Sequence, residues 1–271
     1  MTRPVILTAH AFLNESGFGN HRFFKPWTNA DEARSFRWSR ISEQPFDRFG
    51  RLDPLCRGAV AVVEMLGLQP PDDGAPMGNV ALLLGTSTGS LAVDISFCRT
   101  IGQPGGASPM LFSYTLPSTA IGEIAIRHRI GGPNVCLNAG PESALLALWE
   151  GVRWIEEGEA DIALCVACEA EAVPPNSPLR AAAFLVQNAE YRGHHPMAPL
   201  AVLRFCAAGE LPVGAHLDAS PTEAMSRLGA PAGSSGPNAS ELVYLRRPSV
   251  LRDSARAFAL VGDSHSAGST P

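Results

Sequence analysis

Two stretches of this chain are apolar at every position, and they constrain the fold more than any other feature. Residues 80–84 read Val-Ala-Leu-Leu-Leu, and residues 162–168 read Ile-Ala-Leu-Cys-Val-Ala-Cys. Strands in an antiparallel sheet with one wet face alternate between polar and apolar residues, whereas strands of a parallel sheet are covered on both faces and do not. The sequence therefore predicts strands at 80–84 and 161–168 that are buried on both faces.

Segments with helical periodicity alternate with these strands. Helices are expected at residues 51–68, 90–101, 116–130 and 141–157. The last helix is the clearest, with one apolar stripe made by Leu145, Leu148, Val152 and Ile155. Pro141 suits the first position of a helix and Glu142 suits the positive end of its dipole, so this helix is predicted to begin at residue 141.

The remaining elements complete an α/β pattern. Further strands are expected at residues 5–13, 135–138, 181–186, 200–206 and 258–261, with 181–186 and 200–206 as a pair. Alternating strands and helices predict an α/β domain over residues 1–206. Residues 207–271 are richer in Gly, Pro, Ser and Ala and form a C-terminal extension or the remnant of a second half.

Composition excludes several classes of partner. The 271 residues are 45% hydrophobic and 17% charged, with a formal net charge of −5. Because the net charge is negative, neither nucleic acid nor an anionic membrane surface is an expected partner. No stretch reaches the roughly 20 apolar residues of a membrane span. A cytoplasmic location is expected, because the six cysteines lie mostly in apolar runs, as buried free thiols do.

Cys165 and Cys168 form a C-x-x-C pair inside one of the buried strands. A redox motif needs its first thiol exposed near the start of a helix, and no second cysteine pair completes a zinc site. The sequence therefore predicts neither a metal nor a cofactor.

A Gly-x-Ser-x-Gly motif at residues 85–89 opens one functional alternative. It follows a strand and precedes a helix, as a nucleophile elbow does, and it resembles the Gly-Thr-Ser-Thr-Gly elbow of patatin-type lipases. A hydrolase would use Ser87, with Asp161 and His194 or His195 as the nominated partners. Patatin-type lipases use a Ser–Asp dyad, with a glycine-rich oxyanion loop before the serine and an Asp-Gly pair after it. Here no Gly-Gly-Gly-x-Arg loop precedes Ser87, and the Asp-Gly pair, Asp73-Gly74, comes before the serine. The other interpretation is a tight strand-to-helix turn in which glycine permits the backbone angles.

A second set of motifs covers more of the chain. Residues 132–147 read Gly-Pro-Asn-Val-Cys-Leu-Asn-Ala-Gly-Pro-Glu-Ser-Ala-Leu-Leu-Ala. They resemble the active-site segment of β-ketoacyl synthases, the condensing enzymes of the thiolase-like superfamily, which reads G-P-x-x-x-x-x-T-A-C-x-S-x-x-x-A. Other stretches resemble the family in the same order, namely residues 5–17, 79–89, 108–126, 157–169 and 181–186. The resemblance implies a layered thiolase-like fold and mainly its N-terminal half.

The resemblance also implies a disabled active site. The family's nucleophilic cysteine falls on Pro141, which has neither a thiol nor a backbone N–H. Cys136 lies five residues too early to replace it. The family's two decarboxylation histidines come from its C-terminal half, and His194, His195, His216 and His265 do not lie in versions of those motifs. No catalytic residue is therefore expected.

Within the superfamily the chain resembles chain-length factors, which pair with an active ketosynthase and shape the product tunnel. The resemblance implies a non-catalytic subunit in type II fatty-acid or polyketide elongation, aryl polyene pathways among them. Its partners would be a catalytic ketosynthase, as a heterodimer, and an acyl carrier protein, directly or through that subunit. The candidate interface or tunnel residues are Met110, Phe112, Tyr114 and Leu116, with the chain's own core as the alternative location. A scaffold that only binds carrier protein is a further alternative.

Overall fold

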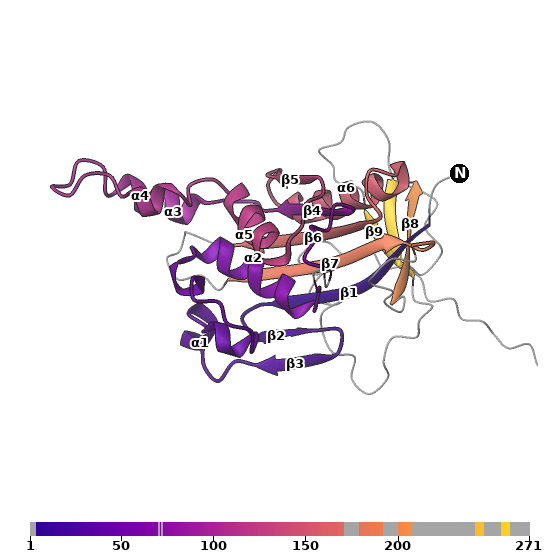
Figure 1. The fold of residues 1–271 in the computed structure, drawn as a ribbon, viewed down its shortest axis with the longest axis horizontal. Coiled ribbons are helices and arrows are strands. Elements are labelled where there is room, and N and C mark those ends of the chain that lie inside the picture. Colours follow the sequence, from indigo (N-terminus) through magenta and orange to yellow (C-terminus); the bar gives the residue numbers. More distant parts are fainter. Residues whose placement is uncertain are drawn as a thin grey trace, which may run out of the picture.

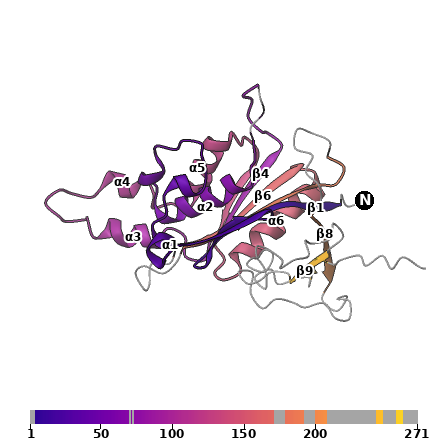
Figure 2. The ribbon, with the colours of Figure 1, turned by 90° about the horizontal axis from the view of Figure 1, so that it is seen from below.

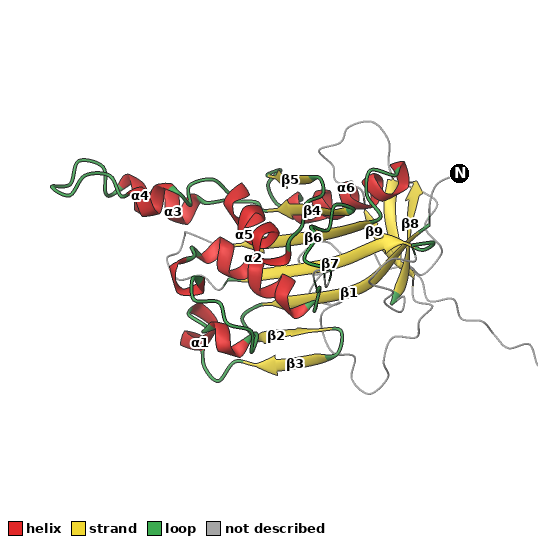
Figure 3. Cartoon of the chain, viewed as in Figure 1, coloured by secondary structure: helices red, strands yellow, loops and turns green. Residues whose placement is uncertain are grey.

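The computed structural model describes residues 4–69, 71, 73–170, 179–191 and 200–207, and two further strands at 242–246 and 256–260. A mixed sheet runs through this part of the chain in the order β5-β4-β6-β7-β1-β8-β10-β9 (Figures 1 and 3). Its strands are β1 (Val5–Leu13), β4 (Val80–Gly85), β5 (Asn134–Leu137), β6 (Ile162–Glu169), β7 (Arg180–Asn188), β8 (Ala201–Ala207), β9 (Leu242–Arg246) and β10 (Arg256–Leu260). A hairpin of β2 (Gly17–Asn20) and β3 (Phe23–Pro26) pairs with β1.

Helices cover both faces of this sheet (Figure 2). The α-helices are α1 (Ala30–Arg34), α2 (Pro54–Met65), α3 (Leu91–Cys98), α4 (Pro109–Phe112), α5 (Ser118–His128) and α6 (Ser143–Glu157), and 3-10 turns lie at Trp38–Arg40 and Phe49–Arg51. Helices α2 and α5 pack on one face and α6 packs on the other. The α/β fold class that the sequence predicts is confirmed.

The two uniformly apolar runs form the centre of the sheet. Strand β4 pairs in parallel with β5 on one side and with β6 on the other. Every residue of β4 is buried, and so is every residue of β6 except Glu169. Within β4, Leu82 and Leu84 face α2 and α5, whereas Leu83 faces α6. The pattern has no polar positions because both faces of these strands are covered by helices.

One predicted strand pairing is wrong. Strands β7 and β8 do not pair with each other, because β1 lies between them and is antiparallel to both. Eight of the nine residues of β1 are buried, so this strand needs neighbours along both edges. The sheet thereby joins residues that are far apart in sequence, such as Leu13 and Ala181.

The predicted start of α6 is also wrong, by two residues. The helix begins at Ser143, Glu142 is its N-cap residue, and Pro141 precedes both. The Ser143 hydroxyl accepts a bond from the Ala139 N–H at 2.8 Å and donates one to the Gly140 carbonyl at 2.6 Å. These bonds, with Gly140 at φ +63°, hold residues 139–142 as a tight turn outside the helix. The predicted apolar stripe of α6 is confirmed, since all four of its residues are buried.

The sheet continues past the predicted domain boundary at residue 206. Strand β8 pairs with β10, and β10 pairs with β9, so both described strands of residues 207–271 extend the same sheet. A strand near residues 258–261 is therefore confirmed, whereas the division into 1–206 and 207–271 stays a prediction. In the described residues, no helix is long and apolar enough to cross a membrane.

The packing of α6 on β4 gives the first test. A Cβ added to Gly85 would lie 2.2 Å from the Ser143 carbonyl oxygen, so the backbone of β4 or of α6 would have to shift. We expect Gly85→Ala to lower the free energy of unfolding by about 3 kcal/mol or more, measured by urea denaturation. The matched control is Gly50→Ala, because a Cβ there meets nothing within 4 Å. Equal stability of the two variants would show that this contact is not a constraint on the fold.

Candidate functional site

The carboxyl ends of the parallel strands and the amino end of α6 meet at one edge of the sheet. Gly85 ends β4 beside Ala167 of β6, and it lies against the backbone of Ser143 at the start of α6. The Thr86 N–H donates to the Leu137 carbonyl at the end of β5, at 3.1 Å. Functional sites of sheets with parallel strands form at this edge, because the loops that follow the strands gather there. The candidate site is built from these loops.

The Gly-x-Ser-x-Gly motif forms the turn that follows β4. The backbone N–H of Ser87 donates to Oε1 of Glu169 at 2.6 Å, and its hydroxyl donates to Oε2 at 2.7 Å. The hydroxyls of Thr86 and Thr88 each lie 3.5 Å from the same Oε2. Gly89 has φ +58°, a conformation that favours glycine. One carboxylate therefore holds the whole turn, and packing requires both glycines.

The arrangement around Ser87 differs from a Ser–His–Asp triad, because a carboxylate and not an imidazole accepts the bond from the serine hydroxyl. The group bonded to the Ser87 hydroxyl in the described residues is the Glu169 carboxylate. Asp161, the acid that a triad with Ser87 could use, does not lie near the turn that contains Ser87. Asp161 precedes the first residue of β6, whereas Glu169 is the last, so the length of the strand, about 25 Å, separates Asp161 from the turn. His194 and His195 lie outside the described residues.

Pro141 lies in the exposed turn between β5 and α6, two residues before the helix. It supplies neither a side-chain nucleophile nor a backbone donor to this edge. Cys136, on β5, is half-buried, and burial raises the pKa of its thiol. A thiol with a raised pKa is mostly protonated at neutral pH and is a poor nucleophile. The alignment of Pro141 with the family's cysteine stays a prediction.

The C-x-x-C pair lies within the core. Cys165 packs against Gly151 of α6, and Cys168 donates to the Leu55 carbonyl of α2 at 3.4 Å. Burial raises the pKa of both thiols far above the usual range. The described part of the chain contains no group of three or more His, Cys, Asp and Glu residues that could hold a metal ion.

Residues 91–117 form an arm that projects beyond the end of the sheet (Figures 1 and 2). The arm consists of α3, α4 and the loop between them, and its two helices touch through the rings of Phe97 and Phe112, 5.5 Å apart. It carries most of the exposed large apolar side chains of the described residues, namely Leu91, Ile101, Met110, Phe112 and Leu116, and Ile126 on α5 adds a sixth.

The four predicted interface or tunnel residues divide into two groups. Met110, Phe112 and Leu116 are 61%, 63% and 66% exposed, so they do not fill the core of this chain. Tyr114 is half-buried and packs against the core under α2 and α5. Tyr114 therefore attaches the arm to the body of the protein, and the other three side chains face outward.

The base of the arm is tied together and adjoins the turn that contains Pro141. The Ser90 hydroxyl, at the entry to the arm, donates to the Thr115 carbonyl at its exit, at 2.5 Å. At Gly89 an added Cβ would lie 2.8 Å from Pro117 and 3.4 Å from the side chain of Asn138. Asn138 directly follows β5. The apolar arm and the β5–α6 turn are therefore neighbours.

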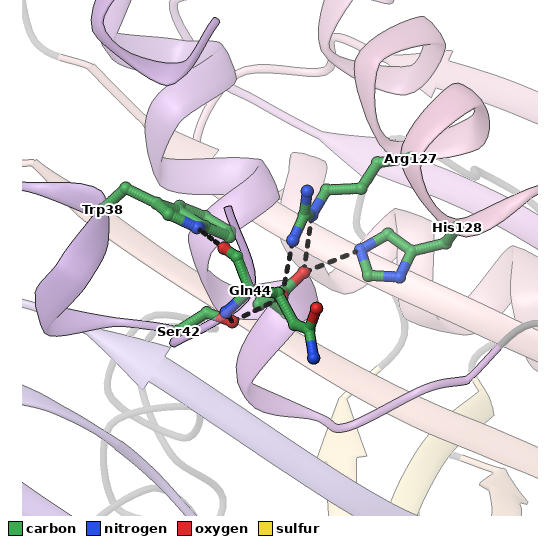
Figure 4. A network of polar contacts seen from close by, with 6 residues as sticks. Trp38, Ser42, Gln44, Arg127 and His128 are labelled. Carbon is green, nitrogen blue, oxygen red and sulfur yellow. Dashed lines mark hydrogen bonds and ion pairs between the residues drawn. The ribbon is translucent and has the colours of Figure 1, made fainter. Parts of the chain in front are cut away.

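A network of polar contacts anchors α5, the helix into which the arm returns (Figure 4). Arg127 of α5 donates twice to the Glu64 carboxylate of α2, each time at 2.7 Å, and its guanidinium lies 4.6 Å from the ring centroid of Trp38. Burial alone raises the pKa of Glu64, yet the bonds from Arg127 and Ser42 outweigh it and hold that pKa below its usual value. Burial lowers the pKa of neighbouring His128, so its ring is mostly neutral at pH 7. This network leaves no signature in the sequence, because its members have no motif in common.

The Glu64–Arg127 pair gives a second test. Removing the cation from a desolvated pair leaves the carboxylate uncompensated, so Arg127→Met is expected to cost about 3 kcal/mol of unfolding free energy in chemical denaturation. Arg153 of α6 is the matched control, since it pairs with Glu150 and Glu157 but its side chain is 36% exposed, against 16% for Arg127. Arg153→Met is expected to cost less than about 1 kcal/mol. A cost for Arg127→Met as small as that of the control would contradict a structural role for the network.

Comparison with known proteins identifies the family. The profile described as "Beta-ketoacyl synthase, N-terminal domain" matches residues 28–195, more than half of the chain. The chain therefore belongs to the β-ketoacyl synthase N-terminal domain family. A search of curated proteins finds no match.

Solved structures show the same fold at low sequence identity. The structure titled "The ishigamide ketosynthase/chain length factor" is 20% identical, with a TM-score of 0.54 over 75% of this chain and 67% of that one. A ketosynthase (ApeO) in complex with its chain length factor (ApeC) from Xenorhabdus doucetiae is 15% identical, with a TM-score of 0.55 over 96% and 99%. AntDE:AntF, a type II polyketide acyl carrier protein in complex with its ketosynthase, is 12% identical, with a TM-score of 0.63 over 97% and 100%. The ketosynthase fold extends through the described strands beyond residue 195.

Proposed function

We propose that this chain is a non-catalytic, chain-length-factor-type partner of a β-ketoacyl-carrier-protein synthase in type II fatty-acid or polyketide elongation. The observation that carries the proposal is the exposed apolar arm beside a turn that offers Pro141 in place of a nucleophile. A similar structure holds a ketosynthase (ApeO) with its chain length factor (ApeC), which supports a partnership of this kind. An aryl polyene pathway is one setting that we propose for it.

The non-catalytic role follows from the chemistry of the β5–α6 turn. An acyl-transferring site needs a nucleophile and N–H groups that stabilise the oxyanion. Pro141 supplies neither, and loss of one oxyanion donor alone typically costs about a hundredfold to a thousandfold in rate. The nearby thiol, Cys136, has a raised pKa and lies on the strand before the turn. We therefore expect the partner to carry the acyl group.

The docking role follows from the arm and from the edge of the sheet. Exposed apolar side chains gathered on a projecting element mark a surface that a partner covers. Strand β5 is the last strand on its side of the described sheet, so one of its edges is open to pairing. Asn138, directly after β5, lies beside Gly89 at the base of the arm, and we assign both the open edge of β5 and the arm to the surface that the catalytic subunit covers.

Two alternatives lead to different outcomes. A hydrolase that uses Ser87 needs a general base beside that hydroxyl, and Glu169 is the carboxylate in that position. The same carboxylate also accepts the Ser87 backbone N–H, which favours a role in holding the turn. Labelling of Ser87 by a fluorophosphonate probe, lost in Ser87→Ala, would favour the hydrolase. A scaffold that only recruits carrier protein would bind without affecting the product. The tunnel role predicts that Phe112, near the middle of the exposed apolar set, influences product length.

The test is co-purification of this chain with its partner ketosynthase. We expect a stable one-to-one complex, detected by native mass spectrometry. The double variant Met110→Ser, Phe112→Ser should weaken that complex at least about tenfold, because two exposed apolar side chains lose their buried area in the interface.

Ile126→Ser is the matched control, because Ile126 is 70% exposed but lies on α5, outside the arm. Weakening by the control but not by the double variant would place the interface elsewhere. Within an intact complex, Phe112→Ala should change the chain length of the product. An unchanged product would favour the scaffold alternative.

A further inference from the structure

Glu169 makes contacts that neither the Gly-x-Ser-x-Gly motif nor the interface explains. It is the last residue of β6 and the one residue of that strand that is not fully buried. Its two carboxylate oxygens receive both the backbone N–H and the hydroxyl of Ser87, at 2.6 and 2.7 Å. Hydrogen bonds to a charged carboxylate are about twice as strong as neutral ones and are more directional. Glu169 therefore fixes the turn on a rigid central strand.

A chain of contacts leads from this carboxylate to the arm. The Gly89 N–H donates to the Thr86 hydroxyl at 3.1 Å, so the turn is closed within itself. Ser90 follows directly and bonds the Thr115 carbonyl, which joins the entry and exit of the arm. Glu169 thus holds the entry to the arm through the turn, and Tyr114 holds its exit by packing on the core.

A small rotation at the base of the arm displaces the far end of the arm by a larger distance. Helix α3 alone spans about 12 Å, so a rotation of about 10° at its start moves its far end by about 2 Å. Such a displacement is large for a group that lines an acyl tunnel, because the position of that group sets the space left for the chain. The tilt of the arm is therefore as important as its apolar composition.

We propose that Glu169 is a positioning residue that sets the direction of the arm and thereby the chain length that the complex selects. This inference rests on the proposed function, because it assigns a specificity role to the same docking surface. It also gives the serine of the Gly-x-Ser-x-Gly motif a role without hydrolysis, since Ser87 is the group through which Glu169 acts.

Three variants separate the contributions of the two hydrogen bonds that Glu169 accepts from Ser87. Glu169→Ala removes both acceptors, Glu169→Gln keeps one oxygen for the Ser87 N–H, and Ser87→Ala removes only the hydroxyl bond. Glu157→Ala, on the exposed end of α6, is the control. Hydrogen exchange of the free chain should show exchange at residues 87–94 rising about tenfold in Glu169→Ala, less in Glu169→Gln, and not in the control.

The deciding measurement is the product distribution of the reconstituted complex at saturating partner, by mass spectrometry. We expect Glu169→Ala to broaden or shift the chain lengths, Glu169→Gln to restore most of the wild-type pattern, and the total rate of condensation to change less than about threefold. A merely structural role would lower the melting temperature without moving the distribution. Should Glu169→Ala not fold, Glu169→Gln and Ser87→Ala carry the same comparison.

Two results would overturn the inference. One is unaltered exchange at residues 87–94 in Glu169→Ala, since the carboxylate would then not hold the base. The other is a loosened base with an unchanged product distribution. Failure of the proposed function is distinguishable from both, because the wild-type chain would then form no complex with the ketosynthase.

Discussion

The amino end of α6 packs so closely on the carboxyl end of β4 that no side chain fits between them. Gly85 meets the backbone of Ser143, and Gly151, two turns further along α6, meets the Cys165 thiol of β6. This contact fixes α6 across one face of the sheet and places the β5–α6 turn at the sheet edge. Because the same edge holds the turn after β4, one contact brings together Pro141, Ser87 and the base of the arm.

The carboxyl-end edge of the sheet lies between the buried core and the exposed arm. On the core side, β4 and β6 are buried between helices on both faces. On the solvent side, the arm exposes Met110, Phe112 and Leu116. The Glu169 carboxylate holds the near end of the arm, and the Glu64–Arg127 pair holds the helix that follows it. A surface that is apolar, projecting and anchored at both ends suits docking to a larger subunit.

The sequence predicted the strands that depend on uniform burial, because a run without polar residues has few other structures open to it. It did not predict the partners of β7 and β8, since β1 enters between them from the far end of the chain. The start of α6 was misplaced because Pro141 suits a helix start and a tight turn equally well, and the Ser143 hydroxyl decides between them. From the sequence, the apolar residues of the arm could lie either in the core or at an interface. Their high exposure in the structure excludes the core for Met110, Phe112 and Leu116.

The proposed non-catalytic role requires that this chain does not take the acyl group itself. Intact-mass spectrometry of the reconstituted complex, after incubation with an acyl carrier protein thioester, measures this. We expect one acyl adduct on the partner ketosynthase and none on this chain. A stable acyl adduct on this chain, mapped to Cys136 and lost in Cys136→Ser, would contradict it.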